Sequence, residues 1–251
     1  MGRRIMTRWH APEPEELVYV VGDIHGSIEK LGALLDRIDN DISRNPGTSG
    51  KVVFVGDYID RGEASADVLR FMAQVTGDYP DRLVGLIGNH ERMLLDFLSD
   101  PTGSAKRWIR YGGLQTLASF GVGAGLTTDT RNAGDLLDAA GDLMDAMGQG
   151  LVDWMTNLPL SWSSGTLWVV HAGADPAVAM DRQQPKTLLW GTEAFLQEER
   201  HDGQWVAFGH QPFETPFAEA GRIAVDTGAV YGGLLTAARI DPEGDVSFIS
   251  V

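Results

Sequence analysis

The sequence of 251 residues contains no cysteine. This absence excludes disulfides, thiolate metal sites and cysteine nucleophiles, so any metal site in the chain has to use oxygen atoms and imidazole nitrogens. The sequence also lacks a run of the roughly 20 apolar residues that a membrane-spanning helix needs. The basic N-terminus is not followed by the apolar stretch of a secretory signal. We therefore expect a cytoplasmic protein without a membrane partner.

Basic residues are also few, with 20 Lys and Arg against 35 Asp and Glu and a formal net charge of −15. An acidic surface repels polyanions, which argues against nucleic acid as a bulk partner. This argument does not extend to a local site, because bound divalent cations would reverse the sign of the charge there.

Five apolar segments of strand length each end at a short polar motif that contains glycine. The segment 83–87, for example, leads directly into Gly88-Asn89-His90-Glu91. The four other motifs are GDIHG at 22–26, GDYIDRG at 56–62, HAG at 171–173 and GH at 209–210. Polar groups are costly to bury without partners, and glycine lets the backbone turn sharply beside a ligand. The five strand ends therefore predict one functional site.

The order of the predicted elements indicates an α/β fold. Helices over about 28–44 and 64–76 separate the strands before the first three motifs, which is typical of parallel strands with helical crossovers. Residues 92–160 show no strand signal, so we predict a single domain over 1–251 with a helical insertion at about 92–160. The later strands are predicted at 222–225, 233–240 and 246–249, as an antiparallel set.

The chemistry of the motifs points to metal ions. Four of the six histidines occur in them, together with Asp23, Asp57 and Asn89. Seven oxygen and nitrogen ligands without sulfur suit a pair of divalent ions such as Mn²⁺, Fe or Zn²⁺. Two ions about 3.5–4 Å apart can convert a shared water to hydroxide and hold phosphate oxygens. Phosphoryl transfer needs such charge stabilisation, so we predict hydrolysis of a phosphate ester.

The motif set, in this order, resembles the metallophosphoesterase superfamily. More narrowly, it is similar to the phosphoprotein phosphatase branch, which includes bacterial and phage serine/threonine phosphatases. The forms GNHE and GDYIDRG carry most of this resemblance, and the similar region extends from about 17 to 235. The resemblance implies a two-sheet α/β sandwich flanked by helices, with the metals at the carboxyl-end rim of the sheets, where open α/β sheets bind their ligands.

The resemblance also implies a role for each motif residue. His90 would be the general acid that protonates the leaving alkoxide, and Asp60 would hold its tautomer through a hydrogen bond. Arg61 would bind phosphate oxygens, and Asn89 would contact substrate as well as metal. The implied metal ligands are Asp23 and His25 for the first ion, Asp57 as the bridge, and Asn89, His171 and His210 for the second ion.

One position departs from the family pattern. The family usually has a second phosphate-binding arginine, which in bacterial members often follows a tryptophan, but here Gly191-Thr192 follow Trp190. Arg92 or Arg107, from the insertion, are the candidates to replace it. Loss of one charge-assisted contact would cost about 1.5–3 kcal/mol, which weakens phosphate binding without abolishing the metal chemistry.

Three functions follow, in order of preference. The first is a serine/threonine protein phosphatase that acts on a phosphorylated protein or a small phosphate ester with two divalent ions, most readily Mn²⁺. The second is a dinucleoside polyphosphate or nucleotide hydrolase of the symmetrical tetraphosphatase type. Those relatives tend to have Asp as the last residue of the motif at 88–91. Glu91 at this position therefore favours the phosphoprotein substrate. The third is an inactive scaffold of the same fold, which the complete ligand set opposes.

Overall fold

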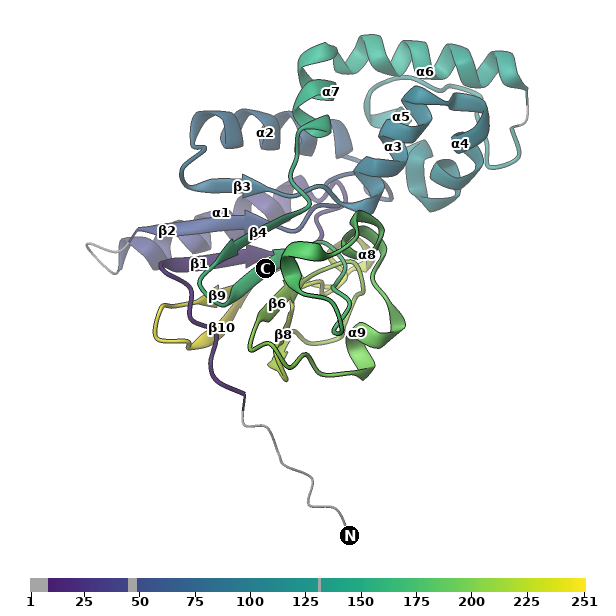
Figure 1. The fold of residues 1–251 in the computed structure, drawn as a ribbon. Coiled ribbons are helices and arrows are strands. Elements are labelled where there is room, and N and C mark those ends of the chain that lie inside the picture. The colour runs from purple at the N-terminus through teal and green to yellow at the C-terminus, as the bar shows by residue number, and fades with distance from the viewer. Residues whose placement is uncertain (1–8, 45–48, 131) are drawn as a thin grey trace.

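Two five-stranded sheets face each other in the computed structural model, which describes residues 9–44, 49–130 and 132–251 (Figure 1). The first sheet has the order β10 (Val246–Ser250), β9 (Thr236–Ile240), β1 (Leu17–Val21), β2 (Gly50–Phe54) and β3 (Leu83–Gly85). The second has the order β4 (Ser161–Ser164), β5 (Leu167–Val170), β6 (Trp205–Phe208), β8 (Arg222–Ala224) and β7 (Phe217–Glu219). Strands β1, β2 and β3 run parallel, as do β5, β6 and β8.

The prediction for the late strands is partly wrong. Strands β9 and β10 pair antiparallel in the first sheet, as expected. Strand β8, however, lies in the second sheet, where it is parallel to β6 and antiparallel to β7. The apolar pattern of a three-residue strand shows that it is buried, but it does not identify the neighbouring strand.

The two sheets enclose a layer of aliphatic side chains. Because side chains alternate along a strand, Val18 and Val20 of β1 point into this layer, whereas Tyr19 points to the opposite face of the sheet. Strand β5 contributes Leu167 and Val169 to the same layer. The continuous apolar segments of the sequence therefore reflect strands that are buried on both faces.

Helices cover the outer face of each sheet. Helices α1 (Ile28–Ser43) and α2 (Ser65–Asp78) pack on the first sheet, and α8 (Pro185–Trp190) and α9 (Glu193–Gln197) pack on the second. Two 3₁₀ turns, Met180–Arg182 and Ala229–Tyr231, lie in the connecting loops. The predicted two-sheet α/β sandwich flanked by helices is confirmed.

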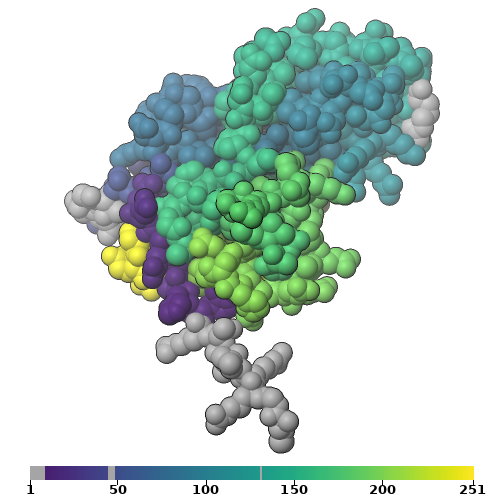
Figure 2. All heavy atoms as spheres, viewed as in Figure 1, coloured from purple at the N-terminus to yellow at the C-terminus, as the bar shows by residue number. Residues whose placement is uncertain are grey.

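Residues between β3 and β4 form a helical lobe beside the sandwich (Figures 1 and 2). Its elements are α3 (Asn89–Ser99), α4 (Pro101–Trp108), a π-helical turn (Ile109–Gly113), α5 (Leu114–Ser119), α6 (Ala133–Met147) and α7 (Gln149–Thr156). Between 92 and 160 the described residues contain no strand. No helix in the described part of the chain is both long and apolar enough to cross a bilayer.

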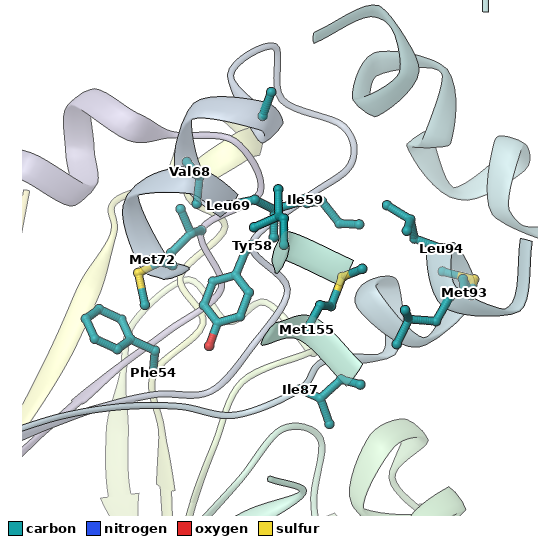
Figure 3. Packing of buried hydrophobic residues seen from close by; sticks show 14 of the residues in the cluster. Phe54, Tyr58, Ile59, Val68, Leu69, Met72, Ile87, Met93, Leu94 and Met155 are labelled. Carbon is teal, nitrogen blue, oxygen red and sulfur yellow. The ribbon is translucent and has the colours of Figure 1, made fainter. Parts of the chain in front are cut away.

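The helical lobe and the sandwich share one buried cluster. Phe54 of β2 and Met72 of α2 belong to it, and so do Leu94 of α3 and Met155 of α7 (Figure 3). Buried side chains in contact transmit shifts because interiors are close-packed. The lobe is therefore held in a defined position relative to the ends of the strands.

Candidate functional site

The five motifs come together beyond the carboxyl ends of β1, β2, β3, β5 and β6. Hydrogen bonds connect motifs that are far apart in the sequence. The main-chain N–H of His210 donates to both carboxylate oxygens of Asp23, at 3.0 Å each. Asn89 Oδ1 lies 2.7 Å from His171 Nε2. The expectation that the strand ends form one cluster is therefore correct.

The backbone of this cluster is strained. Six non-glycine residues of the described chain have a positive φ, and five of them belong to the motifs: His25, Asp57, Asp60, Arg61 and His210. Such conformations cost about 1–3 kcal/mol each and persist only where the surroundings enforce them. Strain concentrated in one cluster indicates that these side chains are held in a functional arrangement.

Two glycines permit the close approach of neighbouring loops. A Cβ atom at Gly88 would collide with Oδ1 of Asp57, and a Cβ atom at Gly209 would collide with Oδ1 of Asp23. Any other residue at these positions would displace a carboxylate from the cluster.

Two groups of side chains have the geometry of metal ligands. In the first, Asp57 Oδ2 lies 3.6 Å from His25 Nε2 and 3.8 Å from His90 Nε2. In the second, Asp57 Oδ1 lies 3.4 Å from His171 Nε2, and His210 completes the group. The ligand atoms of each group lie within 4.8 Å of one another. Asp57 belongs to both groups through different oxygens, an arrangement in which one carboxylate can bridge two ions.

The tautomers of two of these histidines put the lone pair of the ring on Nε2, the atom that would bind a metal. Nδ1 of His25 donates to the carbonyl oxygen of Ile59 at 2.6 Å. Nδ1 of His171 donates to the carbonyl oxygen of Val55 at 3.0 Å. A carbonyl only accepts, so the proton lies on Nδ1 and the lone pair of Nε2 faces Asp57.

Burial opposes charge throughout the cluster. It raises the pKa of Asp23 and Asp57 well above the usual range, and the nearby Asp226 acts in the same direction on Asp23. It lowers the pKa of His25 and His171. Neutral imidazoles are the form that binds a metal, and a divalent cation would compensate the carboxylate charges. The donor set therefore fits hard or borderline divalent ions.

His90 and Asp60 form a buried pair beside these groups. His90 Nδ1 donates to Asp60 Oδ2 at 2.6 Å, and Asp60 also accepts from Trp108 Nε1 at 3.0 Å and from Thr116 Oγ1 at 2.6 Å. Burial raises the pKa of Asp60 to about 8, against the effect of the Thr116 and Trp108 hydrogen bonds, and lowers the pKa of His90. These bonds fix the imidazole with Nε2 toward Asp57.

The sequence interpretation missed Trp108 and Thr116 as partners of Asp60. Both lie in the helical insertion, outside the five motifs, so no local pattern in the sequence assigned them a role. The two residues approach Asp60 only because the π-helical turn and α5 pack against the loop that follows β2.

Glu91 has a structural role in the cluster. Its carboxylate accepts from the main-chain N–H groups of Gly88 and Asp57 at 2.9 Å and of Tyr58 at 2.8 Å. The bonds from Asp57 and Tyr58 join the second motif to the third, and the bond from Gly88 closes the third motif on itself. The side chain thus holds the loop that carries Asp57 in place.

Arg61 lies at the edge of the cluster. Its Nη1 is 2.9 Å from His25 Nε2, the atom that faces Asp57. The guanidinium carbon also lies 5.5 Å from the ring centre of Tyr231, whose side chain is 63% exposed. Tyr231 therefore lies at the rim of the site.

Of the two candidate arginines, Arg107 lies near the site and Arg92 does not. Arg92 forms an ion pair with Asp96 in its own helix, at 2.7 Å. The guanidinium carbon of Arg107 lies 4.0 Å from the ring centre of Trp190, whose ring is 6.2 Å from that of His210. Arg107 is thus separated from a candidate metal ligand by one aromatic ring.

A pocket of about 310 Å³ opens beside His210. Its lining includes Trp190, Thr192, Phe195, Phe208, His210 and Gln211. A larger cavity of about 460 Å³ lies in the insertion, between 121–126 and α6, and no motif residue lines it. The smaller pocket is therefore the one that is continuous with the candidate site.

Comparisons with known proteins agree with this geometry. The family profile described as "Calcineurin-like phosphoesterase" matches residues 17–233. The chain is 25% identical to a bis(5'-nucleosyl)-tetraphosphatase PrpE [asymmetrical] of Bacillus velezensis, covering 91% of this chain and 90% of that one. It is 28% identical to serine/threonine-protein phosphatase 1 of Salmonella typhimurium, over 89% and 91% of the two chains. A solved putative diadenosine tetraphosphatase matches with a TM-score of 0.62 and 21% identity, over 96% and 98% of the chains.

Proposed function

The chain belongs to the calcineurin-like phosphoesterase family and is a metal-dependent phosphatase, and on this premise we propose that it hydrolyses its substrate with two divalent ions bridged by Asp57. The proposal rests on one observation. Asp57 belongs to two ligand groups, and the His90–Asp60 pair lies directly beside the first of them. A general acid and two metal sites are thus within reach of one phosphate.

We assign the metal ligands as the sequence predicted. Asp23 and His25 would hold the first ion, Asp57 would bridge, and Asn89, His171 and His210 would hold the second. The geometry places His90 as near to Asp57 as His25 is, but the Asp60 hydrogen bond favours an acid role for His90. When bound, the two ions activate a water and neutralise phosphate charge, and Mn²⁺ is the ion that we favour over Fe or Zn²⁺.

The chain's own residues account for the remaining chemistry. Arg61 binds phosphate oxygens through its planar N–H groups. His90 donates a proton from Nε2 to the leaving oxygen, and Asp60 accepts the Nδ1 hydrogen bond that keeps the ring in this orientation. Asp60 acts through His90 and is a positioning residue.

Two substrate classes are compatible with this machinery. The Salmonella relative is named for phosphoserine and phosphothreonine proteins, and the Bacillus relative for dinucleoside tetraphosphates. Glu91 favoured the first class in the sequence, but its carboxylate binds main-chain groups of two loops and faces no substrate position. The phosphoprotein and the small phosphate ester therefore remain joint candidates, and a cytoplasmic location remains a prediction.

The proposal is tested by hydrolysis of an aryl phosphate by the Mn²⁺-loaded protein. We expect His90→Asn to lower kcat/KM by roughly 10²-fold or more, because general acid catalysis contributes about 10²–10⁴-fold. Arg92→Ala, an exposed and separately paired residue, is the control. Turnover by His90→Asn at the wild-type rate would refute the assignment. Metal analysis that finds fewer than two Mn²⁺ ions per chain at saturation would favour the inactive scaffold.

A further inference from the structure

Trp190, at the end of α8, has no role in the proposed reaction but contacts three features around the site. Its ring lies beside His210, it lies under the guanidinium of Arg107, and it lines the pocket of about 310 Å³. The ring is partly buried, so the contact with Arg107 is shielded from water on one side. A single side chain thus joins the helical insertion to the second ligand group.

Arg107 has no acidic partner among the described residues, and no described residue accepts a hydrogen bond from it. Arg92 and Arg200, by contrast, form ion pairs with Asp96 and Asp202. A guanidinium that lies over an aromatic ring is held by a cation–π contact and keeps its N–H edge available. In a chain with a net charge of −15, an unpaired arginine beside a metal site suits a substrate anion.

The pocket beside Trp190 has the character of a ring-binding site. Its walls are aromatic at Trp190, Phe195 and Phe208, and polar at Thr192 and Gln211. Its volume is at the lower end of the range of about 300–1,000 Å³ that is usual for ligand sites. One planar ring system fits such a space, since bases stack on aromatic side chains and polar groups bind their edges.

We propose that Trp190, Arg107 and this pocket form a subsite for a nucleotide leaving group. The pocket would take the base, and Arg107 would bind a phosphate that is not attacked. This inference rests on the proposed function and selects the dinucleoside polyphosphate class over the phosphoprotein class. The family pattern has an arginine after the tryptophan, where this chain has Gly191. On this proposal Arg107, from the insertion, replaces that arginine.

The reaction at this subsite is the hydrolysis of a phosphoanhydride. The oxygen of a water molecule bonds to the attacked phosphorus, and the bond from phosphorus to the bridging oxygen breaks. The leaving phosphate takes the electron pair of that bond and the proton from His90 Nε2, and the protons of the water restore His90 and the solvent. The products are two nucleotides, and no other reactant is consumed.

The test uses four substrates that separate the ring from the additional phosphates. Diadenosine tetraphosphate has both, AMP has the ring alone, tripolyphosphate has additional phosphates alone, and glycerol phosphate has neither. Each is assayed by kcat/KM with the full Mn²⁺-loaded chain at constant free Mn²⁺, because polyphosphates chelate the ion.

We expect Arg107→Ala to lower kcat/KM about tenfold on diadenosine tetraphosphate and tripolyphosphate, and less than about twofold on the other two substrates. Trp190→Ala should lower it by about tenfold on diadenosine tetraphosphate and AMP. Arg92→Ala should change none of the four values. Trp190→Phe keeps an aromatic ring, so its kcat/KM should lie much closer to wild type than that of Trp190→Ala. This comparison separates loss of stacking from misfolding.

The possible failures can be told apart. If Arg107→Ala lowers all four values equally, or none, while the wild-type protein hydrolyses glycerol phosphate, the subsite is refuted and the proposed function stands. If wild type hydrolyses none of the four, nor an aryl phosphate, the proposed function itself is refuted. A wild-type preference for a phosphoserine peptide over diadenosine tetraphosphate would also overturn the nucleotide assignment.

Discussion

The motif loops and the aromatic rim of the site differ in burial and in bonding. His90 is 1% exposed and Asp60 is fully buried, and both hold hydrogen bonds inside the protein. At the rim, Tyr231 is 63% exposed and lies near the guanidinium of Arg61, and Tyr111 is 46% exposed and meets the His90 ring edge to face. The buried region has one available arrangement, whereas side chains of the rim are free to adapt.

This difference suggests a division of roles. A preorganised buried cluster suits the reaction, because dipoles and ligands that are already oriented need no rearrangement in the transition state. An exposed rim suits the choice of substrate, because changes there alter binding without disturbing the metal ligands. Substitutions in the two regions should therefore separate effects on kcat from effects on KM.

The largest effect is expected at the bridging residue. Asp57→Asn removes a charge shared by two ligand groups, so the protein should bind fewer than two Mn²⁺ ions and lose more than roughly 100-fold in kcat. This limit follows because residues that only orient metal ligands already contribute about 10–100-fold. Metal analysis together with aryl phosphate turnover measures both quantities. Full activity with two bound ions would contradict the role of Asp57 as a bridge.

An intermediate effect is expected at the residue that positions His90. Asp60→Asn should lower kcat by roughly 10–100-fold. Loss of the carboxylate disfavours the imidazolium, so the pKa of His90 falls and the decline of kcat/KM with rising pH begins at a lower pH.

The readout for Asp60 is a pH–rate profile of the wild type and the variant. Trp108→Phe, which removes one of the donors to Asp60, should show a smaller loss. A uniform reduction of the rate at every pH, with the shape of the profile unchanged, would point to a general structural defect instead.

The smallest effect is expected at the rim. Tyr231→Ala removes the ring near Arg61, and an exposed cation–π contact contributes about 0.5–1 kcal/mol. We expect KM to rise about two- to fivefold while kcat stays the same. Steady-state kinetics on an aryl phosphate decide this point. A large fall in kcat would place Tyr231 with the buried machinery and would remove the contrast between the two regions.

The structure of the rim also explains what the sequence interpretation did not reach. Arg92 and Arg107 had equal standing as replacements for the missing arginine. The structure separates them because Arg92 is one turn away from Asp96 on the same helix, whereas Arg107 meets Trp190 from another part of the chain. A contact between 107 and 190 leaves no periodic pattern in the sequence, and the same is true of the placement of β8 in the second sheet.

The sequence alone determined the reaction class and the residues that could support it. Strand segments that end in Asp, His and Asn are costly unless those groups serve a site, and each such motif is local and can be read directly. Only the tertiary structure decided that Trp108 and Thr116 hold Asp60, and that Arg107 rather than Arg92 lies beside Trp190. These are relations between distant segments, and they exist only once the sheets and the insertion have packed together.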